Sequence, residues 1–342
     1  MSPDRRHLLL GFAAALSACH HPVLGPARFD PKVLDKDAPA LIARARPAAF
    51  AIGVMELKTQ KVWYANGEAP FPLGGLAALP IAAALLSLAD EHKLALTDKL
   101  TVRKADLAPP PSVIDQSWRS MPANFAMNIT VQDLLTLALQ YGDSTASDVL
   151  LGRAGGPGAV NAWLHDKGLT GLRVDRYARE TGVQMSGLPS FRPEWRAAPL
   201  FEQALRAVPV NDRQKAMEAY VADPQDTASA QALIGLIYRL WNGDLLSRAS
   251  SDLILRLMAP ALGAVGPLGV AWPKGAAWAH KAADPRSDLG YTPIQGDAGL
   301  LTLKDGRRFA VTALLAGSTA SETQRAQLFA DTGRLMARAI GV

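Results

Sequence analysis

Residues 75–90 form an almost uninterrupted apolar run of Ala, Leu and Ile, and this run constrains the fold more than any other part of the sequence. A helix that is apolar on every side belongs in the centre of a protein. The chain has 342 residues, of which 49% are hydrophobic and 20% charged. This is the composition of an ordinary globular protein, and the chain is long enough to bury such a helix in a full core.

Strand patterns occur on both sides of a long helical stretch. We expect a first helix over residues 32–46, ended by Pro47, and then a hairpin of residues 48–56 and 60–66. The chain is then mostly helical to about residue 258, and Asp305-Gly306 marks a later hairpin turn. The further expected helices are 75–90, 130–140, 159–167, 228–242, 248–258 and 321–340, and the late strands are 278–282, 296–303 and 309–316.

This order of elements predicts an α+β fold with two lobes. The first and last segments can meet in one antiparallel sheet of five strands flanked by helices, made of residues 32–74 and 260–342. Residues 75–259 would form an all-helical lobe. The groove between the two lobes is the best place for a functional site.

The N-terminus has the features of an export signal. Arg5-Arg6 is followed by an apolar stretch, residues 8–16, which is too short to span a bilayer. Small residues then lead to Cys19, and this arrangement resembles a bacterial lipoprotein box. The resemblance implies a signal peptide of residues 1–18, a lipid on Cys19 that anchors the chain to the bilayer, and a tether of residues 19–31. An ordinary signal peptide with a chance cysteine is the alternative, and Arg5-Arg6 also resembles a twin-arginine signal.

Several classes of site and partner are not expected. Cys19 is the only cysteine, so the chain can form no internal disulfide and no cysteine-based metal site. The six histidines lack metal-binding spacing, so we expect no metal and no cofactor. The net charge of +5 is mild and no Lys/Arg block occurs, which argues against nucleic-acid binding. We expect a monomer.

Several segments, in the right order, resemble the class A serine β-lactamases and the penicillin-binding proteins from about residue 32 to the C-terminus. They are Phe71-Pro72-Leu73 before the apolar helix, Thr145-Ala146 with Val149-Leu150-Leu151 and Gly155-Gly156-Pro157, Asp175-Arg176-Tyr177, and His280-Lys281. The resemblance implies the fold of that family, with Arg176 holding its omega loop to a nearby carboxylate. Residues 183–222 form a longer segment than the family leads us to expect.

The positions that would carry the family's chemistry hold other residues. Gly75 and Ala78 stand where the resemblance places the nucleophilic serine and its lysine. The second motif reads Gly142-Asp143-Ser144, so it lacks the hydroxyl that shuttles a proton and the amide that contacts substrate. Ala178 stands at the place of the general base. The third motif reads Lys281-Ala282-Ala283, which keeps the cation and lacks the threonine hydroxyl.

Four residues remain as candidate cleft contacts. They are Asp143, Ser144, Glu180 and Lys281. Asp143 is expected to join a loop to a helix, Ser144 to cap a helix, and Glu180 to be a solvated or paired loop residue. Lys281 is expected either to bind an anionic ligand or to form a structural ion pair. Trp195, Trp272 and Trp278 could line a groove, but core positions are more typical of such residues.

The leading hypothesis is a non-catalytic, lipid-anchored periplasmic protein, in the outer membrane rather than the inner. It would bind a peptidoglycan-derived or β-lactam-like ligand, or an envelope protein, in the former active-site cleft. The first alternative is an active serine hydrolase, such as a β-lactamase, that uses a relocated serine. The second is an assembly factor whose cleft is filled by apolar side chains.

Overall fold

The computed structural model describes residues 29–342, except 109–111, 119–120, 123, 197 and 260–264. The predicted signal peptide, Cys19 and most of the predicted tether lie outside these residues. Within the tether segment, Phe29 is buried against the ring of Phe309, and the Asp30 amide donates to the carbonyl of Ala339. The folded part of the chain therefore starts before residue 31.

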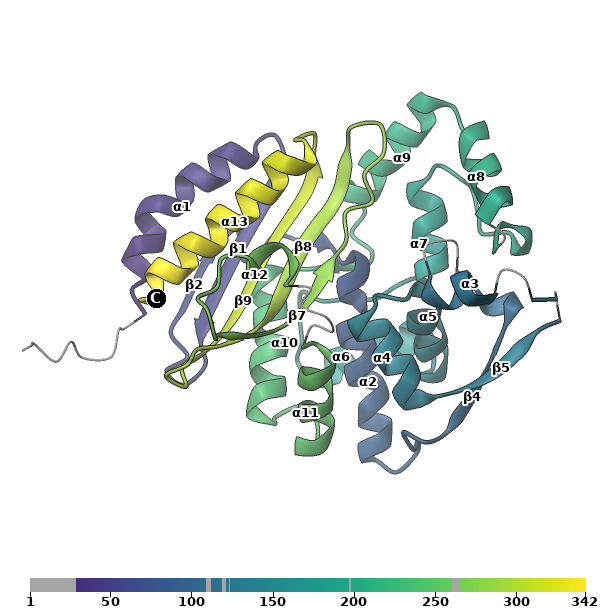
Figure 1. Ribbon diagram of the computed structural model, residues 1–342, viewed down its shortest axis with the longest axis horizontal. Helices are drawn as coiled ribbons and strands as arrows, with labels where there is room; N and C mark the ends of the chain where they lie inside the picture. Colours follow the sequence, from purple (N-terminus) through teal and green to yellow (C-terminus); the bar gives the residue numbers. More distant parts are fainter. Residues whose placement is uncertain (1–28, 109–111, 119–120, 123, 197, 260–264) are drawn as a thin grey trace, which may run out of the picture.

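The predicted five-stranded antiparallel sheet is confirmed. Its strand order is β2-β1-β9-β8-β7, so that strands from the two ends of the chain lie side by side (Figure 1). β8 and β9 are joined at the predicted Asp305-Gly306 turn. The strands are β1 (Ala49–Glu56), β2 (Val62–Ala65), β7 (Ala277–Ala283), β8 (Thr292–Thr302) and β9 (Arg308–Ser318).

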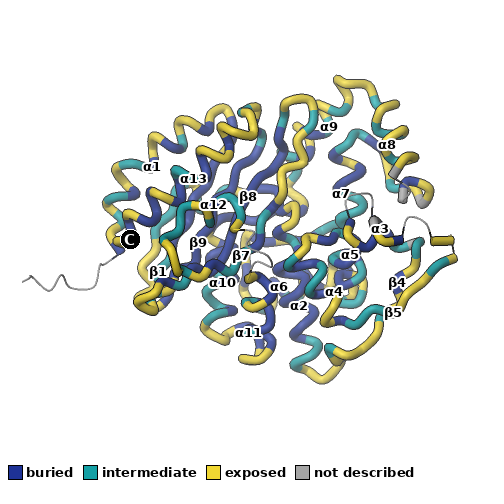
Figure 2. Tube along the Cα trace, in the orientation of Figure 1, coloured by how far each residue is buried: buried dark blue, intermediate teal, exposed yellow. Residues whose placement is uncertain are grey.

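One face of this sheet is covered by helices from both ends of the chain. α1 (Pro31–Ala45) and α13 (Glu322–Ala339) contact each other, and α12 (Gly266–Gly269) contacts α13 and β7. Asp30 caps α1 and Ser321 caps α13. The rings of Phe50 and Phe329 meet edge to face in the core between these layers. Figure 2 shows the buried strands behind exposed outer helix faces.

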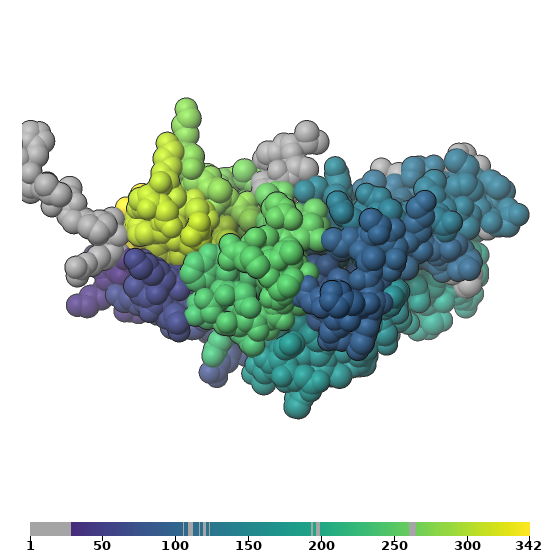
Figure 3. Space-filling model, turned by 90° about the horizontal axis from the view of Figure 1, so that it is seen from below, coloured from purple at the N-terminus to yellow at the C-terminus, as the bar shows by residue number. Residues whose placement is uncertain are grey.

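The opposite face packs on the helical part of the chain. α10 (Ala230–Asn242) contacts β1, β8 and β9, and one continuous apolar core joins the sheet to α2 (Ala78–Asp90). Ten residues of α2, from Ala78 to Ser87, are buried without interruption, which confirms the central apolar helix. In Figure 3 the segment around α10 and α11 (Arg248–Leu257) lies between the chain-end segments and the blue and teal helical block.

The second lobe is mostly helical, but it contains short strands that the sequence did not predict. β4 (Lys99–Arg103) pairs with β5 (Ala126–Thr130), and β3 (Phe71–Pro72) pairs with β6 (Thr227–Ala228). Thr130 caps α4 (Val131–Gln140) as expected. The remaining helical elements are η1 (Gly74–Ala77), η2 (Lys104–Asp106), α3 (Val113–Trp118), α5 (Ser144–Arg153) and α6 (Gly156–Asp166).

The unexpectedly long segment forms helices at one end of this lobe. It begins within α7 (Ala178–Met185) and contains η3 (Pro193–Arg196), α8 (Ala198–Ala207) and α9 (Val210–Ala222). α7 contacts α5 and α9, while Val183, Leu188 and Trp195 form a small core of their own. None of the helices in the described ranges is both long enough and apolar enough to cross a membrane.

Candidate functional site: a cleft between the sheet and the helices

A cavity of about 310 Å³ lies where the edge strand β7 meets α2, α5 and α7. We call it the cleft cavity. Six of the eight candidate positions line it, and these are Gly75, Ala78, Gly142, Ser144, Ala178 and Lys281. Asp143 and Glu180 do not line it. The groove between the lobes is therefore the place where most of the predicted positions converge.

Gly75 and Ala78 lie where a 3-10 turn runs into the central helix. Gly75 belongs to η1, and Ala78 is the first residue of α2. A Cβ atom added to Gly75 would lie 3.0 Å from the carbonyl oxygen of Ala282 on β7. Strand and turn approach too closely for a side chain at position 75 without a local shift. Neither residue can attack a carbonyl or accept a proton.

The Gly142-Asp143-Ser144 segment starts helix α5. Gly142 has φ +66°, a conformation that suits glycine and strains other residues. Asp143 is buried, and its carboxylate accepts hydrogen bonds from the amides of Ala146 and Ile114 and from the Ser112 hydroxyl. Asp143, rather than Ser144, is the N-cap of α5. Its carboxylate is thus committed to joining a loop to a helix, as expected, and it lies outside the cavity for this reason.

Lys281 is the buried cation of the cleft cavity. Lys281 is only 6% exposed. Its Nζ atom lies beside Gly142, 3.3 Å from the position that a Cβ atom would take if Gly142 were replaced by alanine. Nζ makes no hydrogen bond with any residue that the structure describes, although the negative charge of Asp284 acts on it. Burial lowers the pKa of Lys281 to about 8, and Asp284 opposes this shift. The ammonium form still predominates at neutral pH.

Ala178 and Glu180 lie at the start of α7, next to a second buried acid. Glu180 accepts a hydrogen bond from the Tyr177 amide at 2.9 Å, so its carboxylate stabilises the helix end. Asp148 of α5 accepts from the amides of Ala178 and Arg179 at 2.5 and 3.2 Å. Burial raises the pKa of Asp148 to about 7, and these amides and the Arg179 charge lower it in part. Asp148 therefore ties α7 to α5.

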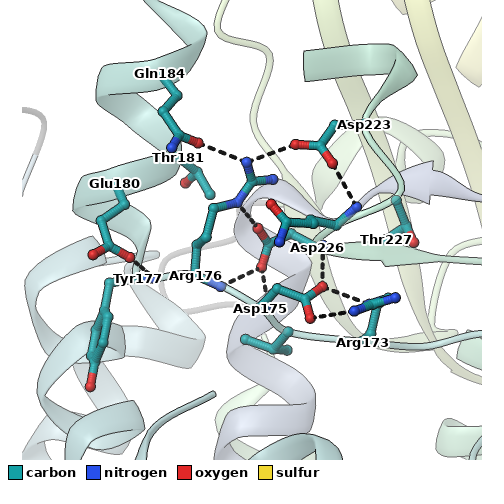
Figure 4. Close-up of polar contacts among 12 residues, drawn as sticks. Arg173, Asp175, Arg176, Tyr177, Glu180, Thr181, Gln184, Asp223, Asp226 and Thr227 are labelled. Atoms are coloured by element: carbon teal, nitrogen blue, oxygen red, sulfur yellow. Dashed lines mark hydrogen bonds and ion pairs between the residues drawn. The ribbon is translucent and has the colours of Figure 1, made fainter. Parts of the chain in front are cut away.

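Arg176 pairs with nearby carboxylates, as predicted, and these pairs also hold the two ends of the long segment together. Its guanidinium donates to Asp226 at 2.5 Å, to Asp223 at 2.8 Å and to Gln184 at 2.7 Å (Figure 4). Asp226 is buried and also accepts from the Asp175 and Arg176 amides. Because Asp223 and Asp226 follow α9, the whole helical insertion of residues 177–222 is closed at its base by this Arg176 cluster.

The sequence did not indicate seven polar residues that line the cavity, and these are Ser147, Asp148, Thr181, Tyr220, Asp226, Asp284 and Arg286. Arg286 Nη2 donates weakly to Ser144 Oγ at 3.5 Å. Asp148 lies one helical turn after Ser144, a spacing that could have revealed it. Asp284 and Arg286 follow directly after β7, where a strand carrying Lys281 leaves the sheet. The tryptophans line no part of the cavity: Trp195 and Trp278 are buried, and Trp272 packs against Trp278.

The cavity offers a ligand positive charge and hydrogen-bond donors. Ser144 has an arginine beside its hydroxyl, and a guanidinium only donates hydrogen bonds. Lys281 offers a positive charge inside an enclosed space. Within the described part of the chain, no group of three or more His, Cys, Asp or Glu side chains is placed to hold a metal ion.

Comparisons with known proteins agree on one family. A sequence model of the Beta-lactamase enzyme family matches residues 34–340. The chain is 26% identical over 307 residues to β-lactamase L2 of Stenotrophomonas maltophilia, covering 88% of this chain and 84% of that protein. It is 30% identical to a β-lactamase of Rhodobacter capsulatus over 129 residues, only 38% of this chain and 42% of that protein.

Solved structures give the same answer for the fold. A β-lactamase from Chitinophaga pinensis superposes with a TM-score of 0.71 at 22% identity, covering 90% of this chain and 99% of that one. An ancestral class A β-lactamase gives a TM-score of 0.68 at 22% identity, with 90% and 99% covered. The chain therefore belongs to the β-lactamase enzyme family and has the class A fold.

Proposed function

We propose that this chain is a non-catalytic member of its family that binds an anionic small molecule in the cleft cavity. The observation that carries the proposal is the content of the cavity. At the positions where the family resemblance places the nucleophile and the bases, the cavity has Gly75, Ala78, Gly142 and Ala178, while Lys281 lines it as a buried cation. The relatives are named β-lactamases, so a peptidoglycan-derived or β-lactam-like anion is the ligand class that the fold favours.

Lys281 supports the binding part of the proposal. A buried ammonium without a hydrogen-bonded partner is costly, because the surrounding protein replaces its hydration poorly. An anion that enters the cavity would remove this cost and gain a charge-assisted hydrogen bond. Arg286, whose guanidinium reaches Ser144 in the same cavity, would add a second donor.

We further propose that the protein is lipid-anchored in the bacterial envelope through Cys19. This rests on the N-terminal sequence alone. Incorporation of labelled palmitate into the chain, and its loss in Cys19→Ser, would support the anchor. An unlabelled but exported chain would contradict it.

The absence of acylation can be tested by intact-protein mass spectrometry after incubation with a fluorescent penicillin. We expect the unmodified mass under conditions that fully label a class A β-lactamase trapped as its acyl-enzyme. A mass increase equal to the penicillin would overturn the proposal. The Ser144→Ala variant serves as the matched sample that locates such an adduct.

One observation favours a second candidate, a hydrolase with a relocated serine. Lys281 has a pKa lowered by burial to about 8 and lines the same cavity as Ser144 and Ser147, so a fraction of its amine is neutral. Ser147 donates its hydroxyl to the Asp143 carbonyl instead. This candidate predicts hydrolysis of an ester or β-lactam substrate that disappears in Ser144→Ala.

A further inference from the structure

The inner end of the cleft cavity is apolar and lies inside the helical lobe. Ala78 and Ile81 of α2, Ala138 of α4 and Leu151 of α5 all line it. Ala138 is 0% exposed and Leu151 is 1% exposed, so the cavity reaches positions that are otherwise sealed from solvent. We call these four residues the back wall.

The small side chains of Ala78 and Gly75 leave the space in front of the back wall open. Ala78 and Ile81 lie on one face of α2, three residues apart, and Gly75 precedes them on η1. Ser147 and Leu151 are likewise one turn apart on α5. A long side chain at position 78 would extend into the cavity. With alanine there, the space continues from Lys281 inward.

Polar groups near the back wall are already committed to the protein. The Asp148 carboxylate accepts from the amides of Ala178 and Arg179, and the Ser147 hydroxyl donates to a backbone carbonyl. The Thr181 hydroxyl donates to the Ala178 carbonyl. These groups offer little to a polar ligand, whereas Lys281 still offers its ammonium.

We propose that the ligand is an organic monoanion with a compact apolar body. Its anionic group binds Lys281, and its apolar chain or ring fills the space against the back wall. A cavity of about 310 Å³ holds a body of roughly ten non-hydrogen atoms at about 30 Å³ each. The inference rests on the proposed anion-binding function and adds to it the apolar half of the ligand.

Straight-chain carboxylates test this directly on the full chain. Acetate, butanoate and hexanoate are titrated by isothermal calorimetry at pH 7, with hexan-1-amine as the probe of opposite charge. Each added methylene that reaches the back wall should tighten binding about fourfold. Hexan-1-amine should not bind, because its ammonium would face Lys281.

Substitutions locate the alkyl chain of the ligand in the protein. Ala78→Leu fills the space and should make the affinities of acetate and hexanoate equal within about twofold. Ala43→Leu makes the same change on the exposed face of α1 and should keep the wild-type dependence on chain length. Ile81→Ala enlarges the space and provides a variant that does not depend on overpacking; it should favour octanoate over hexanoate more strongly than the wild type does.

The outcomes separate the two proposals. Affinity that does not rise with chain length in the wild type overturns the apolar site and leaves the anion site intact. Affinity that rises with carboxylate length in Ala78→Leu as much as in the wild type also overturns it, because the alkyl chain would then lie elsewhere. Failure of every carboxylate to bind, acetate included, contradicts both the anion site and the inference built on it.

Discussion

The Arg176 cluster and the cleft cavity lie side by side, share Arg176 and Asp226, and treat charge in opposite ways. In the cluster, Arg176 is paired with both Asp223 and Asp226, and Asp226 accepts two further backbone hydrogen bonds. In the cavity, Lys281 is as buried as Asp226 but forms no hydrogen bond within the described ranges. The charges of the Arg176 cluster hold the backbone, whereas the Lys281 charge in the cleft cavity is left for a ligand to bind.

This contrast separates two kinds of family residue. Arg176 and Asp143 hold loops to helices, and both are present with their partners. Gly75, Ala78, Gly142 and Ala178 stand where the resemblance places the family's catalytic groups, and we propose that the chain has lost that chemistry. A scaffold needs the first kind to fold and the second kind only for chemistry. A chain that keeps only the first kind would therefore keep the fold without the activity.

The largest effect is expected from Arg176→Ala. It leaves Asp226 buried without its cation and opens the base of the insertion, which should cost about 3 to 5 kcal/mol in the free energy of unfolding. Urea denaturation measures this cost. Arg173→Ala is the matched control, because Arg173 is half exposed in its pair with Asp175 and its loss should cost about 1 kcal/mol or less. Equal costs for the two variants would show that the Arg176 cluster stabilises the fold no more than an exposed ion pair does.

Lys281→Met should stabilise the fold, whereas Arg176→Ala destabilises it. Burial lowers the pKa of Lys281 to about 8, so below pH 8 the folded protein carries a buried charge that costs stability. Methionine should raise the free energy of unfolding by about 3 kcal/mol at pH 7. The gain should shrink above pH 8, as folded Lys281 loses its proton, and vanish near pH 10.5. A destabilised Met variant at pH 7 would mean that Lys281 has a structural partner.

Asp148→Asn should change how stability depends on pH. Burial raises the pKa of Asp148 to about 7 from 3.8, so the wild type loses stability as pH rises from about 4 to about 7. Asparagine does not titrate. The stability difference between variant and wild type should therefore move in favour of the variant by about 2 kcal/mol from pH 5 to pH 8. Parallel unfolding curves at the two pH values would show that the Asp148 carboxyl is not perturbed.

Much of the fold could be predicted because its signals are local. The apolar run of α2, the Thr130 cap and the Asp305-Gly306 turn each specify an element from neighbouring residues. The β4–β5 pair could not be found in this way, because residues 104–125 separate its strands and no short turn links them. The same holds for the helices of the insertion, which are placed by contacts distant in sequence, such as the Arg176 cluster and the Asp148 link between α5 and α7.

The site was predictable to the extent that it follows the family's motifs. Six candidate positions meet in the cavity because a shared fold brings those motifs together. Asp143 and Glu180 point their carboxylates at helix ends, which a list of residue types cannot reveal. Arg286 reaches Ser144 across 142 positions of sequence. Such a contact exists only once β7 and α5 are packed together.

Whether the cleft binds a ligand without reacting with it is tested by the hydrolysis of a chromogenic cephalosporin at high protein concentration. We expect no rate above the buffer blank, for the wild type and for Ser144→Ala alike. A wild-type rate that is proportional to protein concentration and absent in Ser144→Ala would contradict it and identify a relocated nucleophile.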